Sequence, residues 1–225
     1  MARIVKDYAV RRDEILDAGQ RLVYTKGYEQ MSIQDILDEL QIAKGTFYHY
    51  FDSKQALLEA IIARMMAAVE QILIGIVDDA RLTALEKLER FFAASAQWKI
   101  AQKPFFMALL RVWYSDDNAL VRQKVSAAGL SRVMPLLTAI IQQGVREGVF
   151  TTAYPDEVGQ VVLSIAYGVG DAVGEMLLAF DPAADDFGRV ERLVAVYTDA
   201  VERVLGAGAN SLRLVDTAAL KEWFY

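Results

Sequence analysis

Hydrophobic residues recur at intervals of three and four positions along nearly the whole chain. This spacing keeps apolar side chains on one side of an α-helix, because an α-helix turns once every 3.6 residues. Alternating apolar and polar runs, which are typical of strands, are rare, and the chain contains only 4 prolines. The pattern therefore predicts an all-α protein of about ten helices.

The first fifty residues predict two helices before a turn. Apolar residues share one side of the segment from about 7 to 26, and Gly27 is a residue type that commonly ends a helix. Ser32 precedes the next apolar run, and Asp35 follows three positions later, which is the spacing of a capping box. A second, short helix is therefore predicted to begin near Ile33.

The segment AKGTFYHYF, residues 43–51, predicts a third helix with two different sides. A rotation of about 100° per residue places one group of side chains toward the core: Ala43, Phe47, Tyr50 and Phe51. Gly45 then lies at the centre of the outward side, and the residues around it are Lys44, Thr46, Tyr48 and His49. No Asp or Glu occurs between Glu39 and Asp52, so this surface is free of carboxylates.

A glycine in the middle of an exposed helical surface costs about 0.8–1 kcal/mol relative to alanine, so something is expected to approach it closely. Hydroxyl, phenol, imidazole and ammonium groups without carboxylates suit a wall of phosphates with base edges between them. A helix of about seven residues is a rod roughly 10 Å long, which enters a major groove about 12 Å wide. The segment favours a helix-turn-helix on duplex DNA. The alternative for this fragment alone is an aromatic-rich core helix with an incidental glycine.

The run SIQDILDELQIAKGTFYHYFDSKQALLEAI resembles the DNA-binding domain of the TetR/AcrR family of bacterial transcriptional regulators. The capped second helix, the Gly-Thr-Phe-Tyr recognition helix and the Ser-Lys start of a fourth helix carry the resemblance, over about residues 8–62. The resemblance implies phosphate contacts from Ser32, Tyr48, His49 and Lys54. It implies base-edge contacts from Lys44, Gly45 and Thr46.

Two of these positions have an ordinary structural interpretation as well. Ser32 serves as a helix cap whether or not it also binds a phosphate, and Lys54 is otherwise a solvated lysine in the first turn of a helix. The formal net charge is -6, and residues 1–60 hold 8 Lys and Arg against 10 Asp and Glu, which argues against indiscriminate binding to nucleic acid. Four basic residues precede or open the first helix, either as a DNA-binding arm or as a solvated terminus: Arg3, Lys6, Arg11 and Arg12.

The rest of the chain predicts a larger helical domain. We expect residues 1–52 to form the helix-turn-helix DNA-binding domain and residues 53–225 to form a helical ligand-binding and dimerisation domain, with a helix over 53–76 connecting the two. Further helices are predicted from the capping box at Thr83, from Pro104, and over 118–147, 155–180, 186–205 and the final run NSLRLVDTAALKEWFY.

The resemblance implies that the helices at 155–180 and 186–205 form a four-helix bundle in a homodimer, and that an unknown small-molecule effector binds the larger domain. Small residues at 166, 170 and 174 let another helix approach, from within the chain or from a second copy. Candidate ligand-binding residues are Trp98, Phe106, Trp113, Tyr114, Tyr167 and Asp171, although aromatic residues at helical spacing are more often core. Asp171 is unusual in an apolar helix, because a buried carboxylate needs a partner, and a dimer contact, an internal ion pair and a cationic ligand are open alternatives.

Several classes of function are disfavoured. The chain has no cysteine, its single histidine lies in the predicted DNA-binding surface, and no metal or cofactor motif stands out, so we do not expect an enzyme, a metal site or a cofactor. No secretory signal begins the chain, and the most apolar window, 161–180, contains two carboxylates that are costly in a bilayer, so we expect a cytoplasmic protein without a membrane partner.

Together these features predict a sequence-specific DNA-binding transcriptional regulator. The resemblance implies a repressor that binds a palindromic operator on double-stranded DNA as a homodimer and is released by its effector. The alternative is a helical ligand-binding or scaffolding protein without DNA activity.

Overall fold

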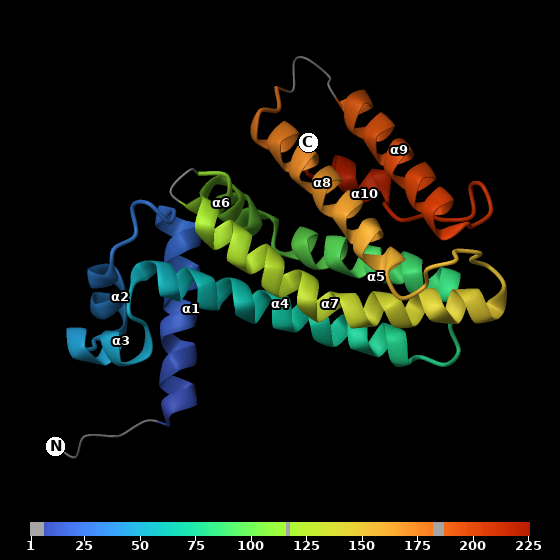
Figure 1. The fold of residues 1–225 in the computed structure, drawn as a ribbon. Coiled ribbons are helices and arrows are strands. Elements are labelled where there is room, and N and C mark those ends of the chain that lie inside the picture. The colour runs from blue at the N-terminus through green and yellow to red at the C-terminus, as the bar shows by residue number, and fades with distance from the viewer. Residues whose placement is uncertain (1–6, 116–117, 182–186) are drawn as a thin grey trace. The chain divides into compact units, whose positions relative to one another are not determined.

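The computed structural model of the protein describes residues 7–115, 118–181 and 187–225 (Figure 1). Over these ranges the chain forms ten helices and no strand, so the all-α prediction is confirmed. The helices are α1 (Tyr8–Lys26), α2 (Ile33–Leu40), α3 (Lys44–Tyr50), α4 (Lys54–Asp78), α5 (Ala84–Ala101), α6 (Lys103–Trp113), α7 (Ala119–Glu147), α8 (Val158–Leu178), α9 (Phe187–Leu205) and α10 (Thr217–Lys221).

The chain divides into two compact units. The first contains residues 1–67 and 102–126, and the second contains residues 68–101 and 127–225. Helix α6 belongs to the first unit because its buried side chains, Phe105, Leu109 and Val112, join the core formed by α1 to α4. These compact units do not coincide with the two functional domains, 1–52 and 53–225, that the sequence predicts. The assignment of functions to those two domains stays a prediction.

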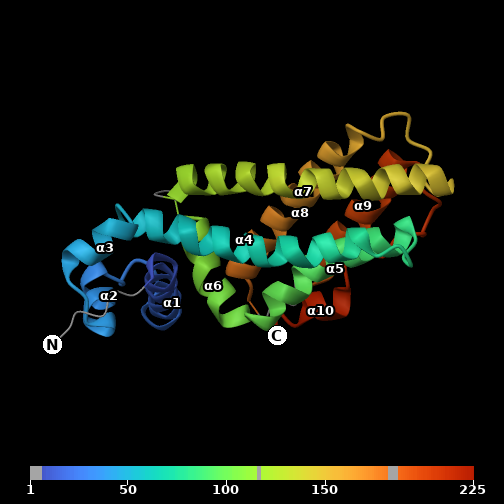
Figure 2. The same cartoon turned by 90° about the horizontal axis from the view of Figure 1, so that it is seen from below.

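The core of the first unit holds the short helices in place. Figures 1 and 2 show α2 and α3 beside α1, with the start of α4 next to them. The predicted apolar stripe of α1 is buried, as is Phe47 of α3, which is 0% exposed. At Gly19, a β-carbon would lie 2.9 Å from Cδ2 of Leu57, so this glycine permits the close packing of α1 against α4.

The predicted helix ends of the first unit are confirmed. Gly27 follows α1 with a φ of 81°, a left-handed conformation that glycine adopts without strain. Ser32 and Asp35 form the expected capping box at the start of α2. Met31 and Ile36, one on each side of that cap, are both buried.

In the described part of the second unit, two charged residues are buried, and both have hydrogen-bond partners. Lys87 is 5% exposed, and its ammonium donates to the carbonyl oxygen of Val77, in the last turn of α4, at 2.6 Å. Glu202 of α9 is 6% exposed, and its carboxylate accepts the backbone amides of Asn210 and Leu212. These contacts satisfy charges that would otherwise destabilise the interior.

The prediction of one amphipathic helix over the last sixteen residues is wrong for most of that run. Only Thr217–Lys221 is helical. Before it, Leu212 and Leu214 are buried while Arg213 between them is exposed, which is the alternation of an extended segment. The amide of Arg213 donates to the carboxylate of Glu89, so tertiary hydrogen bonds replace the helical ones here.

Among the described residues, three helical segments are long and apolar enough to cross a membrane by length and composition alone: Lys54–Asp78, Arg122–Glu147 and Val158–Leu178. At most 22% of the apolar window of each is buried within the single chain. Apolar helices with so much exposed surface also suit contacts with other parts of a protein or with a second subunit. The expected lack of a membrane partner therefore stays a prediction.

Candidate nucleic-acid interface

Helix α3 is a short helix fixed on one side by aromatic residues. Phe47 is 0% exposed and Phe51, just after the helix, is 4% exposed, and their ring centroids lie 6.0 Å apart. Tyr50 is partly buried and packs against the same core. The expectation that Ala43 faces the core is wrong, because Ala43 is the N-cap, its backbone is extended, and its side chain is exposed. The rotation of about 100° per residue does not apply before the helix begins.

The outward side of α3 presents the residues that the sequence predicts. Lys44, Gly45, Tyr48 and His49 are exposed, and Thr46 is partly buried. A β-carbon built at Gly45 would meet no atom within 4 Å, so the space beyond the glycine is open. The glycine is therefore not required by packing within the chain, and the surface is accessible to a partner that approaches the backbone closely.

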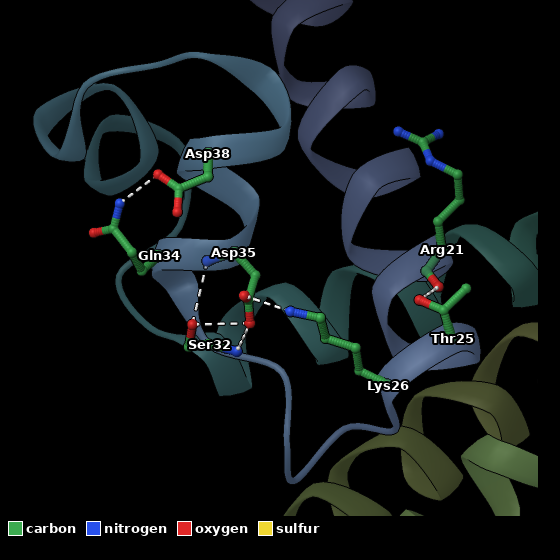
Figure 3. A network of polar contacts seen from close by, with 7 residues as sticks. All are labelled: Arg21, Thr25, Lys26, Ser32, Gln34, Asp35 and Asp38. Atoms are coloured by element: carbon green, nitrogen blue, oxygen red, sulfur yellow. Dashed lines mark hydrogen bonds and ion pairs between the residues drawn. The ribbon is translucent and has the colours of Figure 1, made fainter.

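Ser32 begins α2, and its side chain is engaged in the capping box (Figure 3). The Ser32 hydroxyl accepts a hydrogen bond from the Asp35 amide at 3.2 Å and donates to the Asp35 carboxylate at 2.9 Å. The Ser32 amide donates to the same carboxylate at 2.9 Å. A phosphate at this helix start would therefore compete with Asp35 for the hydroxyl proton.

Lys26 in the last turn of α1 offsets the negative charge of Asp35. Its ammonium lies 2.6 Å from Oδ1 of Asp35, and Figure 3 shows it reaching the carboxylate on the side away from Ser32. The hydrogen bond from Lys26, followed by those from Ser32, lowers the pKa of Asp35 from 3.8 to about 2. Sequence reasoning missed Lys26, because its spacing of nine residues from Asp35 crosses a turn.

Lys54 is not an ordinary solvated lysine in the free protein. Its ammonium lies 4.3 Å from the ring centroid of Tyr28 and donates to the carbonyl oxygen of Glu29 at 3.2 Å. Helix α4 is capped just before it by the Ser53 hydroxyl, which accepts the Ala56 amide at 3.0 Å. The start of α4 is thereby attached to the turn that follows α1, and the position of the ammonium is defined.

The aromatic residue Tyr8, which sequence reasoning did not select, lies against the end of α3. Its ring centroid is 5.7 Å from that of His49 and 4.7 Å from that of Tyr50. Of the basic residues near the start of α1, Arg11 pairs with Glu14 at 2.8 Å, and the guanidinium carbon of Arg12 lies 5.2 Å from the Phe51 ring centroid. Arg3 and Lys6 lie outside the described residues.

The six ligand-binding candidates are distributed over both compact units. Phe106, Trp113 and Tyr114 belong to the first unit; Trp98, Tyr167 and Asp171 belong to the second. Within the single chain, Asp171 lies on the exposed side of α8, and Tyr167 is 42% exposed. Two surface hollows of about 260 and 290 Å³ are lined by none of the six. Their ligand role stays a prediction.

Known proteins match both halves of the chain. Residues 15–61 match the family of bacterial regulatory proteins named after TetR, and residues 111–172 match the tetracyclin repressor-like C-terminal domain. An uncharacterised helix-turn-helix transcriptional regulator of Lactococcus lactis subsp. lactis is 42% identical over 93 residues, which is 40% of this chain and 47% of that protein. The chain thus spans about half the length of this relative.

Two further similarities extend along most of the chain. The transcriptional repressor NemR of Escherichia coli K12 is 22% identical over 188 residues, covering 82% of this chain and 94% of NemR. The crystal structure of the TetR-family regulator PfmR of Thermus thermophilus is 28% identical with a TM-score of 0.51, covering 86% of this chain and 97% of that one. With its helix-turn-helix and its matched N- and C-terminal domains, the chain belongs to the TetR family of bacterial regulatory proteins.

Proposed function

We propose that the protein is a sequence-specific DNA-binding transcriptional regulator that inserts α3 into the major groove of its operator. The observation that carries this proposal is the open space beyond Gly45, on a helix whose opposite side is fixed by Phe47 in the core. Lys44, Tyr48 and His49 are exposed around that glycine. A helix held by its inner side, with a bare and carboxylate-free first turn, suits close contact with base edges between two rows of phosphates.

The remaining contacts fit the backbone of the duplex. Tyr48 and His49 offer a phenol and an imidazole to phosphates, while Ser32 and Lys54 stand at the starts of α2 and α4, where backbone amides favour anions. Few cations are available per chain, so the salt dependence of binding is moderate and two chains on one operator are needed for useful affinity.

The proposal includes a homodimer on a palindromic operator, in the cytoplasm. Helices α8 and α9 carry exposed apolar side chains, among them Val161, Tyr167 and Val196, which a second subunit would cover.

The mode of regulation that we propose is repression, because the relative NemR is named a transcriptional repressor. A coupling free energy of roughly 1–3 kcal/mol between effector binding and operator binding is sufficient for such an effector to release the operator. The family consists of non-enzymatic regulators, and the mechanism requires neither a catalytic residue nor a cofactor.

The test is the substitution Gly45→Arg, with Gly75→Arg as the matched control. Both glycines are exposed on helices, and neither has an atom within 4 Å of a built β-carbon. The operator is first selected by the wild-type protein from a pool of random duplexes. Gly45→Arg is expected to abolish binding although it adds a positive charge, because the long side chain blocks the groove. Gly75→Arg retains operator binding.

The alternative, a helical ligand-binding or scaffolding protein without DNA activity, predicts a different result. The wild-type protein then selects no duplex at low ionic strength, and both arginine variants behave like it. Sedimentation of all three proteins shows that dimerisation is unchanged by Gly45→Arg, so a loss of DNA binding is not a loss of assembly.

A further inference from the structure

Tyr8, the first residue of α1, belongs to an aromatic cluster at the end of α3. The rings of Tyr8 and His49 have centroids 5.7 Å apart and planes at 80°, and those of His49 and Tyr50 have centroids 5.0 Å apart and planes at 83°. The centroids of Tyr8 and Tyr50 are 4.7 Å apart. We call these three residues the Tyr8 cluster. It joins the first turn of α1 to the last turn of α3.

The position of Tyr8 is defined by the local structure of α1. Asp7 is the N-cap of this helix, and its carboxylate accepts the amide of Ala9 at 3.0 Å. This cap fixes where the helix begins and therefore where the first ring projects. The Tyr8 side chain is nevertheless 54% exposed, so burial in the core does not account for its placement.

The cluster adds contacts at the last turn of a short helix. The helix has seven residues and no side-chain hydrogen bond at its N-cap, and an isolated helix of this length is not stable in water. Phe47 and Phe51 secure the side that faces the core. His49 is exposed on the other side, and its imidazole is flanked by Tyr8 and Tyr50 in the near-perpendicular geometry that aromatic pairs prefer.

We propose that Tyr8 is a positioning residue for His49 in operator binding. The Tyr8 ring restricts the rotamers of the imidazole before DNA arrives, so that His49 meets a phosphate without the entropic cost of ordering an exposed side chain. This inference rests on the proposed DNA-binding function. It assigns a role in recognition to a residue of α1, outside the two helices α2 and α3.

The first experiment examines the cluster in the free protein, without DNA. His49 is the only histidine in the chain, so a ¹H–¹³C correlation spectrum contains one histidine Cε1–Hε1 signal, which belongs to His49. Tyr8→Ala is expected to move this signal, because the ring current of Tyr8 is lost. Tyr24→Ala is the matched control: Tyr24 is equally exposed, at 54%, near the opposite end of the same helix, and its removal leaves the signal in place.

The second experiment measures operator affinity in a double-mutant cycle. Tyr8→Ala is expected to weaken binding of the selected duplex roughly threefold to tenfold, whereas Tyr8→Phe, which keeps the ring, changes it by less than about twofold. In a His49→Ala background, Tyr8→Ala has an effect of less than about twofold, because the positioned side chain is gone. Tyr24→Ala binds like the wild type.

Each contrary outcome overturns the inference in a distinguishable way. An unmoved histidine signal in Tyr8→Ala means that the rings do not meet in solution. An equal loss of affinity with and without His49 means that Tyr8 acts on DNA by itself, and an equal loss in Tyr8→Phe means that the hydroxyl acts rather than the ring. If the wild type selects no duplex at all, the proposed function fails as well, and the histidine signal still reports whether the cluster exists.

Discussion

Helices α3 and α8 both display glycines that face open space, but their surroundings differ in charge. Gly45 of α3 and Gly168 of α8 are exposed, and neither has an atom within 4 Å of a built β-carbon. Around Gly45 the exposed side chains carry an ammonium, a phenol and an imidazole. Gly168 has Asp171 three positions later, on the same side of α8, and the exposed apolar residue Val161 two turns earlier.

An exposed helical glycine permits close approach, and its neighbours indicate which kind of partner the surface suits. A surface without carboxylates attracts phosphates, whereas apolar side chains mixed with carboxylates suit a protein surface and repel a duplex. The two helices thus serve the two partners that we propose, DNA for α3 and a second chain for α8.

The largest expected effect comes from removing the anchor on the inner side of α3. Phe47→Ala creates a cavity at a fully buried site and is expected to lower the free energy of unfolding by about 3–5 kcal/mol. Urea unfolding measures this loss. Leu163→Ala, at a buried position of α8, serves as the comparison, with an expected loss of about 2–5 kcal/mol. A loss below about 1 kcal/mol for Phe47→Ala would show that α3 is not secured by this ring.

The second-largest expected effect distinguishes the proposed subunit interface on α8 from the proposed DNA interface on α3. Gly170→Arg on α8 places a long side chain where a second chain is proposed to pack, and overpacking of this kind raises the dimer dissociation constant roughly tenfold to 100-fold. Sedimentation equilibrium measures it. Gly45→Arg leaves that constant unchanged. If Gly170→Arg dimerises normally, the exposed surface of α8 is not the subunit interface, and the assignment of a second chain to α8 is wrong.

A smaller effect tests whether the glycine of α3 is retained for binding. Gly45 is the second residue of α3, so Gly45→Ala is expected to raise the free energy of unfolding by no more than the roughly 0.8–1 kcal/mol of a helix interior, because alanine is the better helix former and its methyl group meets no neighbour. Operator affinity is expected to fall in the same variant. Thermal unfolding and fluorescence anisotropy with the selected duplex measure the two quantities. Should both stability and affinity rise, close approach to DNA is not the reason for the glycine.

The smallest effect concerns the charge beside the DNA-binding surface. The pKa of Asp35 is lowered from 3.8 to about 2, so the stabilisation from its ionised form is complete above about pH 4 and is lost as the pH falls toward 2. Lys26→Ala removes the largest cause and is expected to return this pKa toward its ordinary value. A carboxyl NMR titration measures the change. An unaltered titration would mean that the Ser32 hydrogen bonds alone hold the carboxylate ionised.

The parts of the fold that follow from short-range rules could be predicted from the sequence. The end of α1 at Gly27 and the capping box of Ser32 and Asp35 depend on residues within one helical turn, and both are present. The buried side of α3 was predicted except at Ala43, where helical rotation was extended one residue too far.

The features that the sequence did not reveal depend on residues far apart in the chain. The rings of Tyr8 and His49 meet across two intervening turns, and an amphipathic pattern near Arg213 gives way to a hydrogen bond with Glu89. The sequence left the partner of Asp171 open, because only the fold determines which side of the apolar helix α8 is covered. Single-sequence periodicity contains no information on these pairings.

The placement of Lys54 has a consequence for the energetics of recognition. Its ammonium already rests against Tyr28 and the Glu29 carbonyl oxygen, so a phosphate that binds it exchanges one set of partners for another. The enthalpy gained is only the difference between the two. In return, the lysine is pre-organised, and much of its rotamer entropy is already lost when the chain folds. Such a contact favours rapid, reversible binding of the duplex over high affinity.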